Sequence, residues 1–159
     1  MSLSQVPVAA VIGHPINHSK SPQLHNFWLS KFGVNGYYVP LDIDPRNFEK
    51  HIRSLPRLGF VGANVTIPYK EKILKVADKI SDRAAIIGAA NTLTFLPDGK
   101  IYADNTDGYG FIQNIKSKHK DWTAKDGMSV VFGAGGASRA ILGALIEDGA
   151  NDIVLANRT

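Results

Sequence analysis

The sequence predicts an α/β protein whose main sheet is mostly parallel. Short apolar segments alternate along the chain with segments in which apolar residues recur every three or four positions, as strands and helices do in such proteins. Polar clusters follow several of the apolar segments, and a glycine-rich turn at residues 133–136 separates a strand from a helix. We therefore expect ligands to bind at the carboxyl ends of the strands.

The first part of the chain alternates strands with helices. Residues 6–12 form an apolar run that predicts a buried strand, and Gly13 ends it. After Pro22, apolar residues recur at the spacing of one helix face as far as Gly33. The elements expected next are a strand over 37–41, a helix over 48–55, a strand over 60–67 and a helix over 73–80.

A hairpin and a second unit follow. Residues 92–96 and 100–103 predict two strands joined by a turn at Pro97-Asp98-Gly99, and a helix is expected after Asp107. The strand and helix pattern then restarts with a strand over 128–132, a helix around 140–145 and a strand over 153–156. A junction near Lys125 divides the chain into a first domain over 1–125 and a single βαβ unit over 126–159.

Composition limits the class of protein. The 159 residues are 44% hydrophobic and 20% charged, which is typical of a globular protein and excludes a disordered chain. No apolar run is long enough to span a bilayer, and no basic region precedes the first apolar stretch as it does in a secretory signal. Cysteine is absent, which excludes disulfides and thiolate chemistry and is compatible with a cytoplasmic protein.

The charges do not form a nucleic-acid surface. Lysine and arginine number 18 against 14 aspartates and glutamates, and the resulting net charge of +4 is scattered along the chain. We interpret the densest basic stretch, residues 116–120, as a solvated helix end. The histidines His14, His18 and His25 have no metal-ligand spacing with any set of carboxylates, so no metal site is predicted.

The glycine-rich turn has the setting of a dinucleotide site. Gly133 suits a tight turn, Gly135 lets a pyrophosphate approach the backbone, and the N–H groups at the start of the helix supply donors. Ser138 stands where the usual fingerprint has Gly or Ala, and it could cap the helix instead. The alternative is a tight turn without a ligand. The candidate cofactor-binding residues are Gly133, Ala134, Gly135, Gly136 and Ala137.

The end of the last predicted strand favours NADP over NAD. An NAD site has Asp or Glu at this position, whereas this chain has Asn157, Arg158 and Thr159. A guanidinium pairs with a 2′-phosphate, which a carboxylate would repel. The alternative is a surface arginine with no ligand.

Two serines follow the first strand. Ser19 and Ser21 are two positions apart, so in an extended loop both could donate to a single anion or hydroxyl. Ser21 is also a natural N-cap for a helix with Pro22 at its first position. That structural explanation accounts for Ser21 and leaves Ser19 unexplained.

Polar residues also occur in and after the strand over 60–67. Asn64 and Thr66 are expected on the same side of it, where a buried parallel strand would be apolar. Lys70 is expected at the start of a helix, a position that favours anions, so a functional role competes with that of an ordinary solvated lysine. Asp107 is either an N-cap or, if it lies near Lys70, the partner in a proton-transfer pair.

Together these segments resemble the shikimate dehydrogenase family. The motifs that carry the resemblance are H-S-K-S-P at 18–22, N-V-T-I-P-Y-K at 64–70, G-A-A-N-T-L at 88–93, D-N-T-D-G at 104–108, G-A-G-G-A-S-R at 133–139 and N-R-T at 157–159. They occur in family order and extend over nearly the whole chain. The resemblance implies a substrate domain followed by a Rossmann domain, and the NADPH-dependent, reversible reduction of 3-dehydroshikimate to shikimate.

The resemblance also assigns roles to individual residues. Lys70 would be the catalytic acid and base, with Asp107 as its partner. The substrate-binding residues would be Ser19, Ser21, Asn64, Thr66, Asn91 and Asp107. Asp82 corresponds to a family position linked to the cofactor, as do the glycine-rich turn and Asn157, Arg158 and Thr159.

Family members continue well past the N-R-T motif, so the chain is expected to be truncated, to bind substrate weakly and to turn over little. One alternative is a quinate/shikimate dehydrogenase paralogue that uses NAD, and another is a non-catalytic shikimate-binding fragment. The expected partner is a small-molecule substrate, with no nucleic acid and no membrane. A homodimer is left open.

Overall fold

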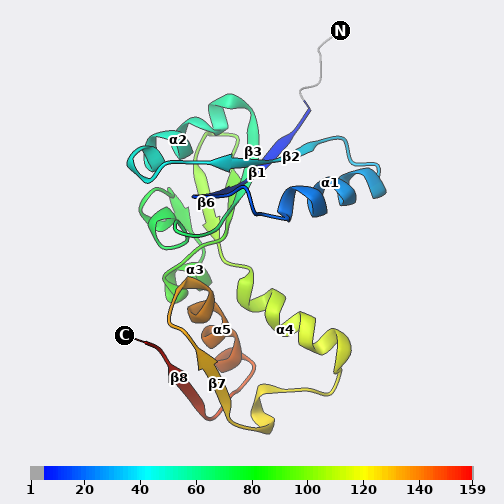
Figure 1. The fold of residues 1–159 in the computed structure, drawn as a ribbon, viewed down its shortest axis with the longest axis vertical. Coiled ribbons are helices and arrows are strands. Elements are labelled where there is room, and N and C mark those ends of the chain that lie inside the picture. Colours follow the sequence, from blue (N-terminus) through cyan, green and yellow to red (C-terminus); the bar gives the residue numbers. More distant parts are fainter. Residues whose placement is uncertain (1–5, 159) are drawn as a thin grey trace.

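The computed structural model describes residues 6–158, which form two parts, one above the other in Figure 1. The upper part contains a sheet in the order β2-β1-β3-β5-β6-β4, and the lower part contains the pair β7-β8. The strands are β1 (Val8–Gly13), β2 (Tyr37–Asp42), β3 (Phe60–Val65), β4 (Lys79–Ile80), β5 (Thr92–Phe95), β6 (Ile101–Asp104), β7 (Ser129–Phe132) and β8 (Ile153–Ala156). The α-helices are α1 (Ser21–Lys31), α2 (Phe48–Ser54), α3 (Asp82–Ile87), α4 (Asp107–Lys118) and α5 (Gly136–Glu147). Short 3₁₀ helices cover Pro45–Asn47, Pro56–Leu58, Lys72–Lys75 and Ala124–Asp126.

The prediction of an α/β fold with a mostly parallel sheet is confirmed. Strand β1 pairs in parallel with β2 and β3, and β4 pairs in parallel with β6. Strand β5 is antiparallel to both neighbours because it enters the sheet through the predicted hairpin. At the hairpin turn Gly99 has a φ of +80°, and the Asp98 side chain accepts from the Lys100 N–H at 3.1 Å.

The larger core lies against one face of the upper sheet. Ile12 of β1, Val65 of β3 and Leu93 of β5 point into it, and Phe48 and Ile52 of α2 cover it. These side chains are at most 5% exposed, so the strands are anchored at their centres. The polar loops that follow the strands are therefore carried by a rigid sheet.

The lower part has a core of its own. Ile112 of α4 and Leu145 of α5 pack with Val131 of β7. Helix α4 descends from the upper part and lies along α5 (Figure 1). The predicted domain junction near residue 125 stays a prediction. In the structure, α4 contributes to the same core as residues 131–145.

Helices α4 and α5 lie close together at Gly108. A Cβ on Gly108 would lie 2.5 Å from the carbonyl oxygen of Ala140 and 2.9 Å from the Cβ of Ala144. We expect Gly108→Ala to lower the free energy of unfolding by about 1–3 kcal/mol, because backbone must shift to admit the methyl group. Gly110→Ala in the same helix meets nothing within 4 Å and is the matched control. In urea unfolding, the Gly110→Ala variant should have an unchanged free energy of unfolding, or one raised by up to about 1 kcal/mol, because alanine favours the helix over glycine. Equal effects of the two substitutions would contradict the close approach.

The expected helix over 73–80 is wrong. Residues 72–75 form a single 3₁₀ turn, after which the chain pairs with β6 as the short strand β4. The buried Ile73 and Val76 have helical spacing, but the backbone N–H of Asp78 donates to the Ile101 carbonyl at 2.9 Å. Pairing with the sheet therefore overrides the helical pattern. The α-helix of this region is α3, which Ser81 caps by accepting from the Ala84 N–H at 3.1 Å.

Among the described residues 6–158, no helix combines the length and the apolar character needed to cross a membrane. In the same range, no group of three or more His, Cys, Asp or Glu side chains is arranged to hold a metal ion.

Candidate active site

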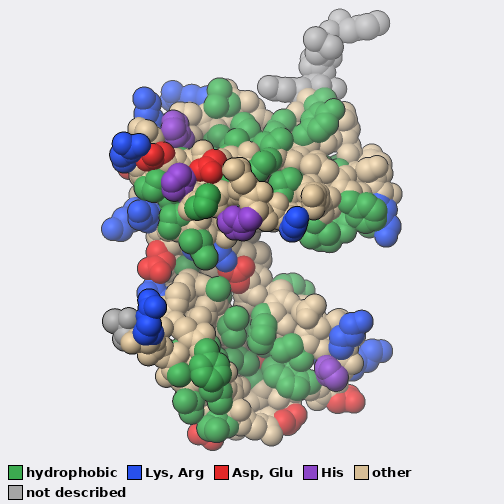
Figure 2. All heavy atoms as spheres, viewed as in Figure 1, with side chains coloured by type: hydrophobic (Ala, Val, Ile, Leu, Met, Phe, Trp, Pro, Cys, Tyr) green, Lys and Arg blue, Asp and Glu red, His purple; other side chains and the backbone are tan. Residues whose placement is uncertain are grey.

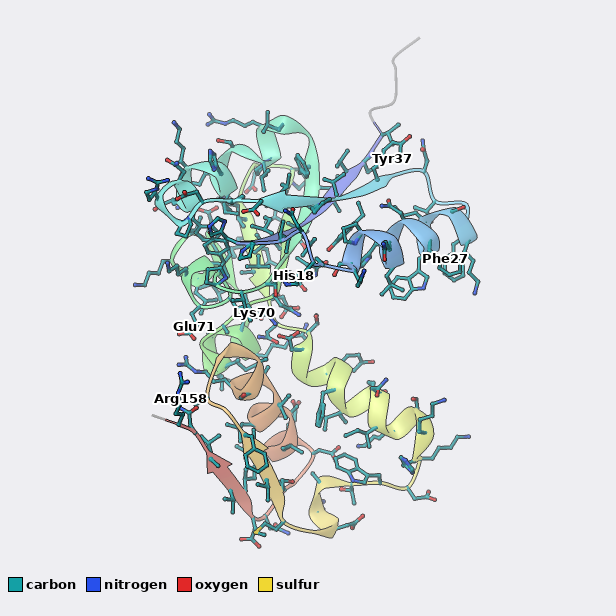
Figure 3. All side chains as sticks on the ribbon, in the orientation of Figure 1. His18, Phe27, Tyr37, Lys70, Glu71 and Arg158 are labelled. Carbon is teal, nitrogen blue, oxygen red and sulfur yellow. The ribbon has the colours of Figure 1, made fainter. Side chains whose placement is uncertain are left out.

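The polar segments converge at one edge of the upper sheet. The register aligns Gly13 with Asp42 and Ile12 with Val65, so β1, β2 and β3 all end there. Strand β5 starts at the same edge, where Thr92 lies between Asn64 and Asp104. Figure 3 shows His18 and Lys70 at this edge, facing the lower part. Figure 2 shows that the molecule is narrower where the two parts meet.

A lysine–aspartate pair lies at the centre of this edge. The ammonium of Lys70 donates to Oδ2 of Asp107 at 2.5 Å, and the two side chains are 18% and 26% exposed. The other carboxylate oxygen, Oδ1, accepts from the Asn91 side-chain amide at 2.7 Å. Asp107 therefore holds Lys70 with one oxygen while Asn91 holds Asp107 by the other. The structure brings these residues together from three separate loops.

Lys70 does not begin an α-helix, so the argument from an unfavourable helix dipole is wrong. It lies in a turn before the 3₁₀ segment Lys72–Lys75. Its backbone is held on both sides instead: Tyr69 is fully buried and stacked on Phe48, and the carbonyl of Lys70 accepts from the Ala90 N–H at 2.7 Å. The lysine side chain is thus presented by a fixed turn.

Asn91 links the loops on either side of the pair. Its Oδ1 accepts from the Thr106 N–H at 3.0 Å while its Nδ2 donates to Asp107. The first residue of α4 is Asp107, and Thr106 occupies the N-cap position, so the interpretation of Asp107 as an N-cap is wrong. The carboxylate points instead at Lys70 and Asn91.

Ser21 is not an N-cap either. It is the first residue of α1, and Lys20 occupies the N-cap position without a side-chain hydrogen bond. The Ser19 hydroxyl accepts from the backbone N–H of Ser21 at 3.3 Å, which gives Ser19 a structural role in the turn before α1. Thr66 follows the end of β3, where its N–H donates to the Ile12 carbonyl at 2.9 Å.

Residues 14–20, between β1 and α1, form the serine loop. Asp42, the last residue of β2, contacts this loop, and sequence reasoning missed it. Its carboxylate contacts Nδ1 of His14 at 2.5 Å and accepts from the Ile16 N–H at 3.3 Å. The hydrogen bond with His14 holds the pKa of Asp42 below its usual value. An acidic residue at the end of a strand adjacent to β1 was the only signal in the sequence.

Asp104 holds the segment that leads into Asp107. Its carboxylate accepts from the guanidinium of Arg83, from the Ser81 hydroxyl at 2.6 Å and from the Asn105 N–H at 2.8 Å. Hydrogen bonding from Arg83, above all, lowers the pKa of Asp104 to about 2. The carboxylate is 16% exposed and so is little screened by solvent.

Asp104→Asn is expected to destabilise the chain in a pH-dependent way. A lowered pKa contributes stability above the unfolded value near pH 4, and this contribution is lost as the pH falls through the folded value of about 2. The variant should lose about 2 kcal/mol at pH 7, and the loss should diminish between about pH 4 and pH 2. Chemical unfolding across this range checks it, with the exposed Asp121→Asn as control. A loss that stays constant down to pH 2 would show that the ion pair is not its source.

The glycine-rich turn lies against Lys70. Gly133 has a φ of +100°, and its N–H donates to the Ala156 carbonyl at 2.8 Å. A Cβ on Gly136 would lie 3.4 Å from the Cβ of Lys70, so the start of α5 directly adjoins the lysine. The N-cap of α5 is Gly135, with no side-chain cap, so the proposed cap by Ser138 is wrong. The turn therefore leaves the helix start free of capping side chains.

The other candidate cofactor residues lie around this turn or apart from it. Ala134 belongs to the turn, and Ala137 to the first turn of α5. Asn157 and Arg158 follow β8, beside the glycine turn (Figure 3), and Thr159 lies outside the described residues. Asp82, the first residue of α3, lines a groove of about 730 Å³ between α3, α4 and α5, which no residue of the glycine turn lines.

A second groove lies on the other face of the upper sheet from the larger core. It has a volume of about 480 Å³. Apolar parts of its wall are formed by Trp28 of α1, by Phe32 just after that helix and by Val61 of β3. Asn64 and Thr92 lie at its boundary with the polar edge. It gives a small ligand an alternative place to bind.

Known proteins have similar sequences and the same fold. A curated shikimate dehydrogenase (NADP(+)) from Roseobacter denitrificans is 56% identical over all 159 residues, and the match covers 57% of that relative. A crystal structure of a shikimate dehydrogenase in complex with NADP+ has a TM-score of 0.90 at 42% identity, over 97% of this chain and 52% of that one. Shikimate 5-dehydrogenase from Thermus thermophilus, in complex with shikimate, has a TM-score of 0.87 at 37% identity, over 96% and 56%. The chain thus spans little more than half the length of these relatives.

The sequence profile of the shikimate dehydrogenase substrate binding domain matches residues 11–93, just over half of the chain. This range contains the serine loop, β3 with Asn64, and Lys70. The chain therefore belongs to the family of the shikimate dehydrogenase substrate binding domain.

Proposed function

We propose that this chain provides the substrate site and the proton-transfer pair of an NADP-dependent shikimate dehydrogenase, which reversibly reduces 3-dehydroshikimate to shikimate. The observation that carries the proposal is the ion pair between Lys70 and Asp107 at 2.5 Å, directly beside the glycine turn at Gly136. An acid and base next to a dinucleotide turn suits a reaction that moves a hydride and a proton together. The relative that is 56% identical is a shikimate dehydrogenase (NADP(+)), which supports the same reaction.

In the proposed mechanism Lys70 handles the proton. Its ammonium stabilises the negative charge that develops on the ketone oxygen and then donates a proton to that oxygen. Asp107 orients the ammonium through their hydrogen bond, and Asn91 fixes the carboxylate at 2.7 Å. In the reverse direction Lys70 accepts the proton of the shikimate hydroxyl. NADPH, when bound, supplies the hydride.

The remaining polar residues would hold the substrate. Ser19, in the loop before α1, and Ser21, the first residue of α1, would donate to the substrate carboxylate. Asn64, Thr66 and Asn91 would bind ring hydroxyls, since amides and hydroxyls both donate and accept hydrogen bonds. The positions of these residues around one sheet edge support this assignment.

The residues around Gly135 fit a dinucleotide. A Cβ on Gly135 would meet nothing within 4 Å, so the backbone is open to a pyrophosphate at the start of the twelve-residue helix α5. Arg158, in the segment after β8, would pair with the 2′-phosphate that distinguishes NADP from NAD. These residues would hold NADP together with Gly133, Ala134, Gly136, Ala137, Asn157 and Thr159. Asp82, which lies in another groove, has the weakest support.

The decisive assay compares two proteins. One is the 159-residue chain, and the other, the extended protein, is this chain followed by the part of the Roseobacter denitrificans relative that lies beyond the match. We expect the extended protein to oxidise shikimate with NADP, and the chain alone to bind shikimate weakly and turn over little. Each protein is assayed with shikimate and quinate, and with NADP and NAD.

The alternatives give different results in the same assay. Oxidation of quinate with NAD by the extended protein would indicate a quinate/shikimate dehydrogenase. Binding of shikimate without turnover would indicate a binding function only. If the extended protein neither binds nor oxidises shikimate, the proposed function is refuted.

A further inference from the structure

Tyr38 lies beneath the site and has no role in the function proposed above. It belongs to the edge strand β2 and is only 5% exposed. Its hydroxyl donates to Oδ1 of Asn64 at 2.7 Å, across β1 from one strand to another. At 2.7 Å, this hydrogen bond is shorter than the contacts of the Asn64 side-chain nitrogen, at 3.3 and 3.4 Å.

The hydrogen-bond network fixes which way the Asn64 amide faces. Its Nδ2 lies 3.3 Å from the Asn91 carbonyl, which can only accept, so the NH₂ group faces Asn91 and the oxygen faces Tyr38. Burial raises the pKa of Tyr38 to about 12, which keeps the phenol protonated and able to donate. The Asn64 side-chain oxygen therefore accepts and the Tyr38 hydroxyl donates.

The contacts of Nδ2 are too long to hold the amide by themselves. The distances to the Asn91 carbonyl and the Thr92 hydroxyl are 3.3 and 3.4 Å, beyond the usual range for N–H···O bonds. These N–H groups can therefore turn to a ligand at modest cost, whereas the oxygen stays bound to Tyr38. The tyrosine is the main restraint on the amide.

Tyr38 itself is held by α1, the helix that begins at Ser21. The Asn26 side chain forms two hydrogen bonds with the Tyr38 backbone, at 2.8 and 2.9 Å. The His25 ring stacks on the phenol ring with 4.1 Å between centroids and 10° between planes. The helix that carries the serines at its start thus also fixes the phenol that holds Asn64.

We propose that Tyr38 is a positioning residue that orients the Asn64 amide for a hydroxyl group of the substrate. With the oxygen held, Asn64 presents N–H donors and one remaining lone pair in a defined direction to a hydroxylated ring. Without the phenol hydroxyl the amide can rotate and exchange donor for acceptor. The inference rests on the proposed function, because it assigns Asn64 to substrate binding.

A double-mutant cycle in the extended protein tests the coupling. Tyr38→Phe keeps the ring and removes the hydroxyl, and we expect it to raise KM for shikimate about fivefold with kcat within about twofold. In an Asn64→Ala background the same substitution should change KM by less than about 1.5-fold, because the amide it orients is gone. Tyr37→Phe is the matched control: it removes an exposed hydroxyl from the preceding residue of the same strand, and it should leave KM unchanged. An unchanged KM in Tyr38→Phe, or an equal rise in both backgrounds, overturns the proposal.

Nuclear magnetic resonance of the 159-residue chain separates this inference from the proposed function. The Asn64 side-chain NH₂ signals should shift and exchange faster in Tyr38→Phe, and should not do so in Tyr37→Phe. If the Asn64 signals do not change in Tyr38→Phe, Tyr38 does not restrain the amide, whatever KM the variant shows. If the signals move but the parent extended protein does not oxidise shikimate, the proposed function fails. The substrate part of the inference fails with it, and the restraint on Asn64 stands.

Discussion

Lys70→Ala in the extended protein is expected to lower kcat for shikimate oxidation by about a thousandfold, with KM changed less than about threefold. The ammonium acts on charge and a proton that appear mainly in the transition state, so its loss affects turnover more than binding. The substitution also leaves Asp107 without its 2.5 Å partner, and Asn91 then holds the carboxylate alone. Steady-state kinetics with saturating NADP measures the effect.

Lys72→Ala is the matched control. Lys72 is exposed in the 3₁₀ turn two residues further on, so it reports on the loss of a nearby positive charge without the ion pair. Its kcat should stay within about twofold of the parent. Near-normal turnover in Lys70→Ala would remove Lys70 from the mechanism, and equal losses in both variants would point to a general electrostatic effect.

Arg158→Ala is expected to raise KM for NADP by about 10- to 100-fold and to leave KM for NAD within about twofold. The estimate reflects the loss of a charge-assisted hydrogen bond to a phosphate. NAD has no 2′-phosphate, so it provides an internal control in the same protein. Kinetics with each cofactor in turn, at saturating shikimate, measures both values.

Arg158→Lys should lie between the parent and the alanine variant. Lysine keeps the positive charge but loses the bidentate geometry of the guanidinium. If the alanine substitution weakens NADP and NAD equally, Arg158 supports the fold of this segment and does not choose the cofactor. If neither changes, the alternative of a surface arginine holds.

Local sequence patterns predicted most of the fold correctly. The strand over 153–156 matches β8, and the hairpin around Asp98 matches β5 and β6, because an apolar run or a turn signal is local. The helix over 73–80 failed because its buried residues have helical spacing while the backbone pairs with β6, more than twenty residues further along the chain. This competition between helix formation and pairing with a distant strand cannot be seen in a short stretch of sequence.

The site shows the same division. The strand ends and their polar loops were visible, so Lys70 and Asn64 could be singled out, whereas Asn91 was assigned only by the family resemblance. The roles of Tyr38 and Asp42 could not, because each acts across a register between strands that the sequence does not specify. The helix caps expected at Ser21 and Ser138 failed because the helices begin earlier than expected, with Lys20 and Gly135 at the N-cap positions.

The central claim is that the polar edge of the upper sheet binds shikimate, and a shikimate titration of the isotope-labelled 159-residue chain tests it most directly. We predict saturable chemical-shift changes in the backbone amides of residues 18–21, 64–70, 91–92 and 105–107, with Lys70→Ala shifting the signals of Asn91 and Asp107 even without ligand. Changes centred on Trp28 and Phe32, in the groove between α1 and the sheet, would contradict the claim, as would the absence of any saturable change.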